Sequence, residues 1–280
     1  MSVRKSSIAA AISFFFSVWS GIAGLPAEAD AVADQFDTVI VDAGHGGEDE
    51  GARGVRGLVE KELVLDVGRR LAALLRRREL QVVMTRSDDR FVPLEQRFAI
   101  ANDARGDLFI SIHANATGDT AVRGVETFFL SLDATDEDAL RVAARENQAF
   151  GASAERPKSI DPLSAILGDL IEADYLNESN EFARLVQLGL AGNESHHSRG
   201  VKQAPFVVLQ GVQMPSSLVE IGFVTNPGEE QRLQSPHARE AVAAALADAV
   251  IEFGRRFDAR RGVASSRVGG AVVPPASDAP

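Results

Sequence analysis

An apolar run that ends in a glycine-rich, histidine-bearing loop restricts the fold of this 280-residue chain more than any other feature. Residues 38–60 read TVIVDAGHGGEDEGARGVRGLVE, so a strand-like run stops at Asp42 and the loop leads through His45 to Glu60, where a helical pattern begins. The carboxyl ends of parallel strands share one edge of an α/β sheet, and the loops there hold reactive groups. We therefore expect an α/β fold with a functional site at that edge.

Strand and helix patterns alternate through the first half of the chain. Strands are expected at residues 38–42, 81–85, 107–113 and 124–130, and helices at 60–78 and 93–104. This alternation at short spacing predicts a single domain with a mainly parallel sheet that is flanked by helices on both faces.

From residue 133 the pattern becomes mainly helical. Helices are expected at 136–150, around 163–171, at 179–190 and at 237–254, with short strands at 206–209 and 217–221. We interpret 133–175 as a helical insertion into a catalytic domain that spans 30–257. Residues 258–280 show no pattern that could bury a core, and they are predicted to form a disordered tail.

Composition narrows the classes of function. The formal net charge is -11, from 40 acidic and 29 basic residues, and Arg76, Arg77 and Arg78 form the one short basic run, so nucleic acid is excluded as a partner. The chain has no cysteine, which excludes disulfides, thiolate metal sites and a cysteine nucleophile. Any bound metal must therefore use histidine and carboxylate ligands.

The N-terminus has the layout of a secretory signal. Arg4 and Lys5 precede an apolar run at residues 8–25, and a small-x-small triplet ends at Ala29. This pattern predicts a signal peptide at 1–29, with cleavage after Ala29. An uncleaved membrane anchor is the alternative, because the run approaches spanning length. No later segment is long and apolar enough to span a bilayer, so no transmembrane segment is expected after cleavage.

Four polar residues are expected at one edge of the sheet. His45, His113 and Glu220 lie at or just past the ends of predicted strands, and the glycine-rich loop brings Glu60 back to them. Two histidines and a carboxylate are the usual ligands of a catalytic zinc, and a further carboxylate such as Glu220 can transfer protons. Asp42 and Ser111 are predicted to orient the histidines.

Each of these residues also has a structural explanation. His45 could be an exposed loop residue, Glu60 an acidic residue favoured at a helix N-terminus, and His113 a hydrogen-bonded residue that closes a strand. Glu220 is harder to explain in this way, because a glutamate within SLVEIGF is costly to bury without a partner. The residues alone leave both explanations open.

Four motifs, in order, resemble the zinc-dependent N-acetylmuramoyl-L-alanine amidases, which trim bacterial peptidoglycan. They are VDAGHGGEDEGARG, VEKELVLDV, SIHANA and PSSLVEIGFVTNPGEE, and the resemblance covers most of 38–130 and 204–256. It implies one Zn²⁺ bound by His45, Glu60 and His113, with Glu220 as the catalytic residue. The implied reaction is hydrolysis of the amide between the lactyl group of N-acetylmuramic acid and the first L-Ala of the stem peptide. Ala43 departs from the pattern, since the family usually has proline there.

The region 133–175 resembles the regulatory insertion of the cell-division amidases in this family. In those enzymes an inserted helix covers the zinc until an activator protein with a degenerate LytM domain displaces it. The resemblance implies a periplasmic, autoinhibited enzyme of cell-wall remodelling and daughter-cell separation. We predict that Glu146, in RVAARENQAF, covers the metal. Glu137 and Glu172 are alternative ligands, and simple packing of the helix is a third possibility.

Two other functions are kept as alternatives. A zinc exopeptidase acting on small peptides could use similar ligands. A non-catalytic peptidoglycan-binding module could keep the fold, although such a module has no need for Glu220.

Overall fold

A central sheet carries two of the candidate site residues, His113 and Glu220. The computed structural model describes residues 35–148, 162–192 and 197–263, with the backbone course alone for 162–174, and all of them belong to the compact unit Ala33–Pro280. Six strands form one sheet in the order β2-β1-β3-β6-β4-β5. Their bounds are β1 Thr38–Ala43, β2 Gln81–Met84, β3 Leu108–Asn115, β4 Val125–Leu130, β5 Ser198–Ala204 and β6 Ser216–Phe223.

The sheet is mainly parallel, as predicted. Only the β4–β6 pairing among the described strands is antiparallel, and β4 then pairs in parallel with β5. The helices are α1 Glu60–Arg77, α2 Leu94–Asp103, α3 Glu137–Glu146, α4 Pro162–Ala191, α5 Val207–Gln210, α6 Pro227–Leu233 and α7 Pro236–Arg260. The predicted single-domain α/β architecture is confirmed.

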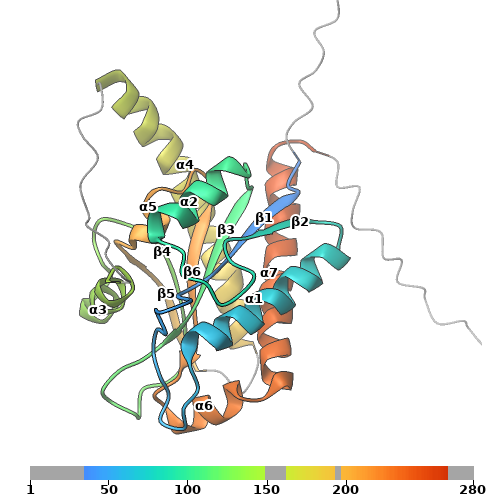
Figure 1. Cartoon of the computed structure of the whole chain (residues 1–280). Coiled ribbons are helices and arrows are strands. Elements are labelled where there is room, and N and C mark those ends of the chain that lie inside the picture. The colour runs from blue at the N-terminus through green and yellow to red at the C-terminus, as the bar shows by residue number, and fades with distance from the viewer. Residues whose placement is uncertain (1–34, 149–161, 193–196, 264–280) are drawn as a thin grey trace, which may run out of the picture. The chain divides into compact units, whose positions relative to one another are not determined.

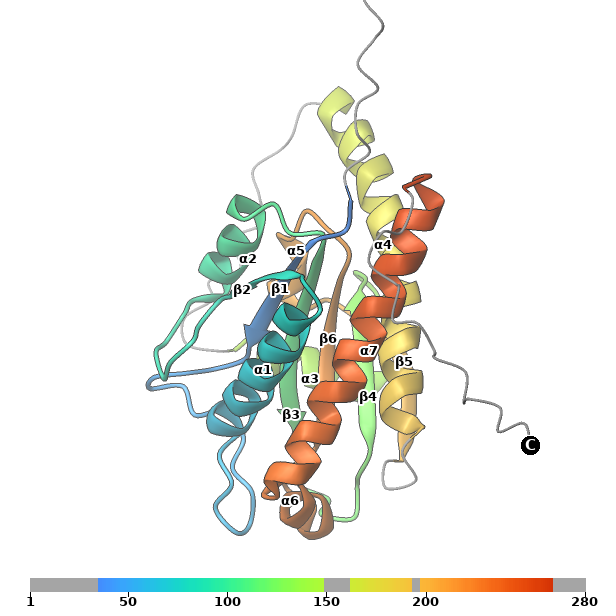
Figure 2. The same ribbon diagram turned by 90° about the vertical axis from the view of Figure 1, so that its right-hand side faces the viewer.

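Helices cover both faces of the sheet. On one face, α1, α4 and α7 pack side by side (Figure 2) over the larger hydrophobic core, to which Val39 and Val41 of β1 belong. On the other face lie α2, α3 and α5 (Figure 1), over a second core that includes Ile40. Side chains alternate between the faces with a period of two, so a buried strand supplies both cores.

One predicted strand in the C-terminal half is wrong, and one strand there was not predicted. Residues 206–209, expected as a strand, instead begin the short helix α5, and the strand that completes the sheet is β5. β5 reads SRGVKQA, which is too polar to be recognised as a strand, and it lies at the sheet edge, where it has one neighbour. An apolar run of four residues such as FVVL does not distinguish a strand from a helix by itself.

The helical boundaries also differ from those predicted. The two helices expected around 163–171 and at 179–190 are one continuous helix, α4. α7 runs to Arg260, and its buried Asp258 accepts a hydrogen bond from the backbone N–H of Phe36 at 2.8 Å. The ordered domain therefore extends beyond residue 257, where the tail was expected to begin. The predicted signal peptide and residues 264–280 lie outside the described residues.

No helix in the described part of the chain has the length and apolar character needed to cross a membrane.

Candidate metal centre

Two glycines allow the loop after β1 to lie against the candidate ligands. A β-carbon on Gly44 would come within 2.3 Å of the ring of His113. A β-carbon on Gly51, which has a φ of +65°, would lie 2.6 Å from the ring of His45. His45 itself has a left-handed φ of 58°, which is uncommon for residues other than glycine. The loop is therefore built so that backbone lies directly beside both imidazoles.

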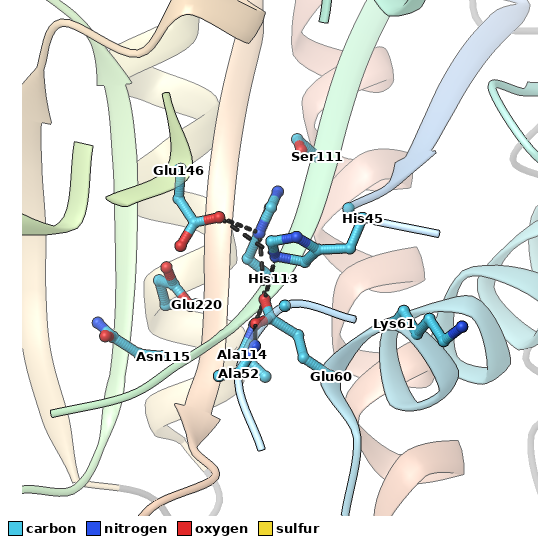
Figure 3. A network of polar contacts seen from close by, with 12 residues as sticks. His45, Ala52, Glu60, Lys61, Ser111, His113, Ala114, Asn115, Glu146 and Glu220 are labelled. Atoms are coloured by element: carbon cyan, nitrogen blue, oxygen red, sulfur yellow. Dashed lines mark hydrogen bonds and ion pairs between the residues drawn. The ribbon is translucent and has the colours of Figure 1, made fainter. Parts of the chain in front are cut away.

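His45, Glu60, His113 and Glu146 form one buried cluster, in which the two carboxylates approach the imidazoles from different directions (Figure 3). His45 Nε2 lies 3.0 Å from Glu60 Oε1 and 3.3 Å from Glu146 Oε2. His113 Nδ1 lies 3.2 Å and 3.0 Å from the same two oxygens. The fold thus brings together the three predicted ligands and the glutamate that was predicted to cover them.

The spacing of these atoms fits a zinc ion. Zinc bonds to nitrogen and oxygen are about 2.0–2.1 Å long, so a tetrahedral ion separates neighbouring donors by about 3.3 Å. The four measured N···O separations run from 3.0 to 3.3 Å. His45 Nε2 and Glu146 Oε2 are also buried without a hydrogen-bond partner among the described residues. Imidazole and carboxylate donors suit zinc better than calcium or magnesium.

Neighbouring groups fix two of the predicted ligands. Asp49 Oδ2 lies 2.9 Å from His45 Nδ1, which leaves Nε2 to face the cluster. Glu60 accepts hydrogen bonds from the backbone N–H groups of Ala52 at 2.7 Å and Ala114 at 2.9 Å. Ligating imidazoles usually have an acceptor of this kind on their other nitrogen.

The prediction that Asp42 and Ser111 orient the histidine rings is wrong. Asp42 instead accepts hydrogen bonds from Ser111 at 2.7 Å, Thr85 at 2.6 Å and Arg97 at 2.7 Å. Arg97 also donates to the backbone carbonyl of His45 at 2.8 Å. Asp42 and Ser111 are register neighbours on β1 and β3, so they bind each other. Asp42 therefore fixes the backbone of the loop, and the residue beside the ring of His45 is Asp49.

The charges within the cluster attract cations. Burial lowers the pKa of His45, but the charge of Glu60 and the hydrogen bond to Asp49 outweigh it and raise this pKa to about 12. Burial also lowers the pKa of His113, and the charge of Glu146 raises it to about 9. For Glu60, burial raises the pKa, and the charge of His45 lowers it to about 2. A dication could replace the protons that these imidazoles hold.

The sequence profile of the N-acetylmuramoyl-L-alanine amidases matches residues 39–252. N-acetylmuramoyl-L-alanine amidase AmiA of Escherichia coli K12 is 35% identical over 231 residues, which cover 82% of this chain and 80% of AmiA. The chain belongs to the N-acetylmuramoyl-L-alanine amidase family.

Two further comparisons agree with this assignment. N-acetylmuramoyl-L-alanine amidase AmiC of Neisseria meningitidis serogroup B is 34% identical over 216 residues, covering 77% of this chain and 52% of AmiC. The structure of AmiC2 of Nostoc punctiforme has a TM-score of 0.61 at 29% identity and covers 79% of this chain and 98% of its own. The family predicted from the four motifs is confirmed, and peptidoglycan amidase activity follows from it.

In this amidase, Glu220 is buried beside the cluster of the two histidines and two glutamates. β6 places it in register with His113 of β3. Neither carboxylate oxygen has a hydrogen-bond partner among the described residues, and Arg145 Nη2 lies 3.5 Å from Oε1. Burial and the charge of Glu146 raise the pKa of Glu220 well above its usual value, against the opposing charge of Arg145. Glu220 is therefore close to the cluster and separate from its four ligand atoms.

Helix α3 carries Glu146 into the site of the amidase. Its first residue, Glu137, is exposed at the other end of the helix, so this alternative ligand lies away from the cluster. The side chain of Glu172, the second alternative, lies outside the described residues. The helix packs on the second core through apolar residues, namely Ala139, Val142 and Ala143.

Sequence reasoning missed Arg145, which directly precedes Glu146. Its guanidinium donates to Asn115 Oδ1 at 3.0 Å and to the carbonyl of Ala116 at 2.6 Å, and it lies against Glu220. The one available signal was an arginine adjacent to the predicted covering glutamate. That signal is weak, because arginine and glutamate are common neighbours on exposed helices.

Proposed function

We propose that this amidase is a zinc enzyme that hydrolyses the amide between N-acetylmuramic acid and the first L-Ala of the stem peptide, and that α3 keeps it inactive. The observation that carries the proposal is the buried His45–Glu60–His113 set, closed on its fourth side by Glu146. Its N···O separations of 3.0–3.3 Å match those around tetrahedral zinc.

His45, Glu60 and His113 would hold the ion, and Glu220 would move the protons. Bound zinc supplies Lewis acidity, which polarises the scissile carbonyl and makes water a better nucleophile. Glu220 would accept the proton of the attacking water and then donate it to the departing amine of L-Ala. Burial raises the pKa of the Glu220 carboxyl, which suits it to that final donation.

The burial of the site supports autoinhibition. A peptidoglycan strand is large and must reach the reacting groups, yet His45 is 8% exposed, His113 6% and Glu220 0%. Glu146 and Glu60 approach the imidazoles from different directions (Figure 3). The neighbouring Arg145 lies against Glu220, with Nη2 3.5 Å from Oε1. Glu146 would therefore occupy the fourth coordination position of the metal, while Arg145 would block Glu220.

Release would require α3 to leave the site. We assign this step to an activator protein with a degenerate LytM domain, as in the cell-division amidases that the insertion resembles. The setting would be the periplasm, during cell-wall remodelling and daughter-cell separation, after export by the signal at 1–29. Membership in a family of cell-wall amidases supports a location outside the cytoplasm.

Zinc content and hydrolysis of purified sacculi test the proposal. The wild-type chain is expected to bind one zinc and to release little product without an activator. Glu146→Gln should keep the zinc and release intact stem peptides, whereas Glu137→Gln, an exposed change on the same helix, should behave as wild type. Release of single amino acids from peptides would instead indicate an exopeptidase. If wild type, Glu146→Gln and Glu137→Gln all lack zinc and are inactive, the binding-module alternative is supported.

A further inference from the structure

The acidic end of α3 lies on two basic side chains of the edge strand β5. Lys202 Nζ is 3.1 Å from Asp136 Oδ2, and Arg199 Nη2 is 3.6 Å from Asp138 Oδ2. The opposite end of the same helix carries Glu146 into the metal cluster. One helix therefore brings carboxylates to two places at once, the candidate metal centre and this basic pair.

The basic pair lies on the same face of the sheet as the candidate catalytic residue. Glu126 of β4 is directly opposite Glu220 of β6, and Lys202 of β5 is paired with Phe128 of β4. Residues two apart on a strand share a face, so Glu220, Glu126 and Lys202 lie on one side of the sheet. Phe128 packs in the core that also contains residues of α3, so this is the side that α3 covers.

Without α3, the basic pair would carry more positive charge than its remaining partner neutralises. Glu126 Oε1 lies 2.8 Å from Arg199 Nε and 3.0 Å from Lys202 Nζ, so one carboxylate faces two cations. Asp136 and Asp138 balance the excess in this structure. With α3 in place, Lys202 is 9% exposed and has both Glu126 and Asp136 as anionic partners.

We propose that Lys202 and Arg199 form a subsite for a carboxylate of the stem peptide, and that α3 imitates the substrate by filling this subsite and the metal centre with its own carboxylates. The inference rests on the proposed amidase function. A stem peptide is joined to the sugar through its N-terminus, so its C-terminus is a free carboxylate. The helical path from Asp136 to Glu146 is about 15 Å long, the reach of roughly four extended residues.

Binding of a released stem peptide tests the subsite without requiring hydrolysis. The protein is the zinc-loaded chain with Glu146→Gln and Asp136→Asn, which removes the carboxylates that face the histidines and Lys202 and leaves Asp138 in place. Asparagine keeps the N-cap, because it caps as well as aspartate. Calorimetry compares a tetrapeptide with free carboxylates against the same peptide with all carboxylates amidated. Adding Lys202→Gln should weaken binding of the free peptide about tenfold, as expected for one lost charge-assisted hydrogen bond.

The controls separate recognition from a structural role. Binding of the amidated peptide should not change with Lys202→Gln, and Lys202→Arg should restore binding of the free peptide. If Lys202→Gln weakens binding of both peptides equally, Lys202 only supports Glu126 and the subsite proposal is overturned. The proposal is also overturned if the free and the amidated peptide bind the parent protein equally well. Failure of the proposed function has a different result: the free peptide still binds through Lys202, but no stem peptide is released from sacculi.

Discussion

Glu60 and Glu146 face the same two imidazoles at nearly equal distances, yet the fold holds them in different ways. Glu60 opens the 18-residue helix α1, accepts two backbone N–H groups and is fully buried. Glu146 ends the ten-residue helix α3, and its Oε2 has no hydrogen-bond partner among the described residues. A helix of ten residues is marginal by itself and depends on tertiary contacts for its position.

Glu60 and Glu146 have the same ligand chemistry but differ in how firmly the fold anchors them. Both glutamates offer the same carboxylate to the same histidines, so donor type alone does not assign their roles. The proposed permanent ligand is fixed by backbone hydrogen bonds and a large core. The proposed cover lies on a short helix that could leave the sheet without unfolding α1 or β3.

Glu220→Gln is expected to have the largest effect. The amide keeps the size of the side chain but cannot accept a proton, so hydrolysis by the Glu146→Gln protein should fall by about 10²–10⁴, the usual contribution of general acid–base catalysis. Zinc content should not change, because Glu220 is not one of the proposed ligands and lies outside the cluster of His45, Glu60, His113 and Glu146. Sacculus digestion and metal analysis of the same sample provide the two readouts. Retained hydrolysis would remove Glu220 from the mechanism.

Glu60→Gln and Glu146→Gln should act in opposite directions. Loss of Glu60 should weaken zinc binding by more than about 100-fold, beyond the 10–100-fold expected for a residue that only supports a ligand, and should lower hydrolysis in proportion to the zinc lost. Glu146→Gln should retain zinc and raise basal hydrolysis. Competition with a chelator measures the affinities, and His237→Ala, an exposed histidine, is the control. Equal loss of zinc in the two variants would make Glu146 a permanent ligand.

Asp49→Asn tests the anchoring of His45 directly. Asparagine keeps the shape but weakens the acceptor at 2.9 Å from Nδ1, so zinc affinity should fall by about 10–100-fold. The same chelator competition measures it. The matched control is Asp89→Asn, an acidic residue that pairs with Lys61 and has no contact with either imidazole in the described contacts. An unchanged affinity would show that Asp49 does not set the orientation of the ring.

Arg145→Gln tests the second contact that α3 makes with the site, the one between Arg145 and Glu220. In the Glu146→Gln protein, Arg145 still lies against Glu220, so its removal should raise hydrolysis by about a further tenfold, the equivalent of one charge-assisted interaction. Steady-state rates on sacculi measure the gain, with Arg141→Gln, an exposed arginine of α3, as the control. If Arg145→Gln does not raise hydrolysis further, Glu146 alone inhibits the enzyme.

The site residues near strand ends were predictable because polar residues of the right chemistry lie beside apolar runs that form the strands. His45, His113 and Glu220 follow apolar runs, and parallel strands bring such positions to one edge. Glu60 was predictable from the glycine-rich loop that precedes it. His45 follows β1, whereas His113 and Glu220 lie inside β3 and β6, close to the carboxyl ends of those strands. Local sequence was sufficient for these three residues because each lies within a few positions of the end of its strand.

The contacts of α3 were not predictable in the same way. Glu146 could be anticipated only through the resemblance to the cell-division amidases, since its place at the metal depends on how a helix crosses the sheet. Arg145, Lys202 and Arg199 depend on the same packing and on β5, a polar edge strand without a clear periodic pattern. No local rule encodes which basic side chain a helix will cover.

Ser111→Ala is expected to leave the metal centre unchanged. Ser111 donates to Asp42, so its loss should cost about 1.5–3 kcal/mol of folding stability, as for a hydrogen bond to a charged group, with no change in zinc affinity. Burial raises the pKa of Asp42, but the charge of Arg97 and the hydrogen bonds lower it below 3.8.

The pH dependence of this loss follows from the direction of that shift. A lowered folded-state pKa contributes stability that is complete above the unfolded value of 3.8 and is lost as the pH falls through the folded value. Denaturant unfolding should therefore show the full difference between wild type and Ser111→Ala at pH 6 and a smaller one below pH 3.8. A difference that persists undiminished in acid, or a loss of zinc affinity, would return Ser111 to the role of orienting His113.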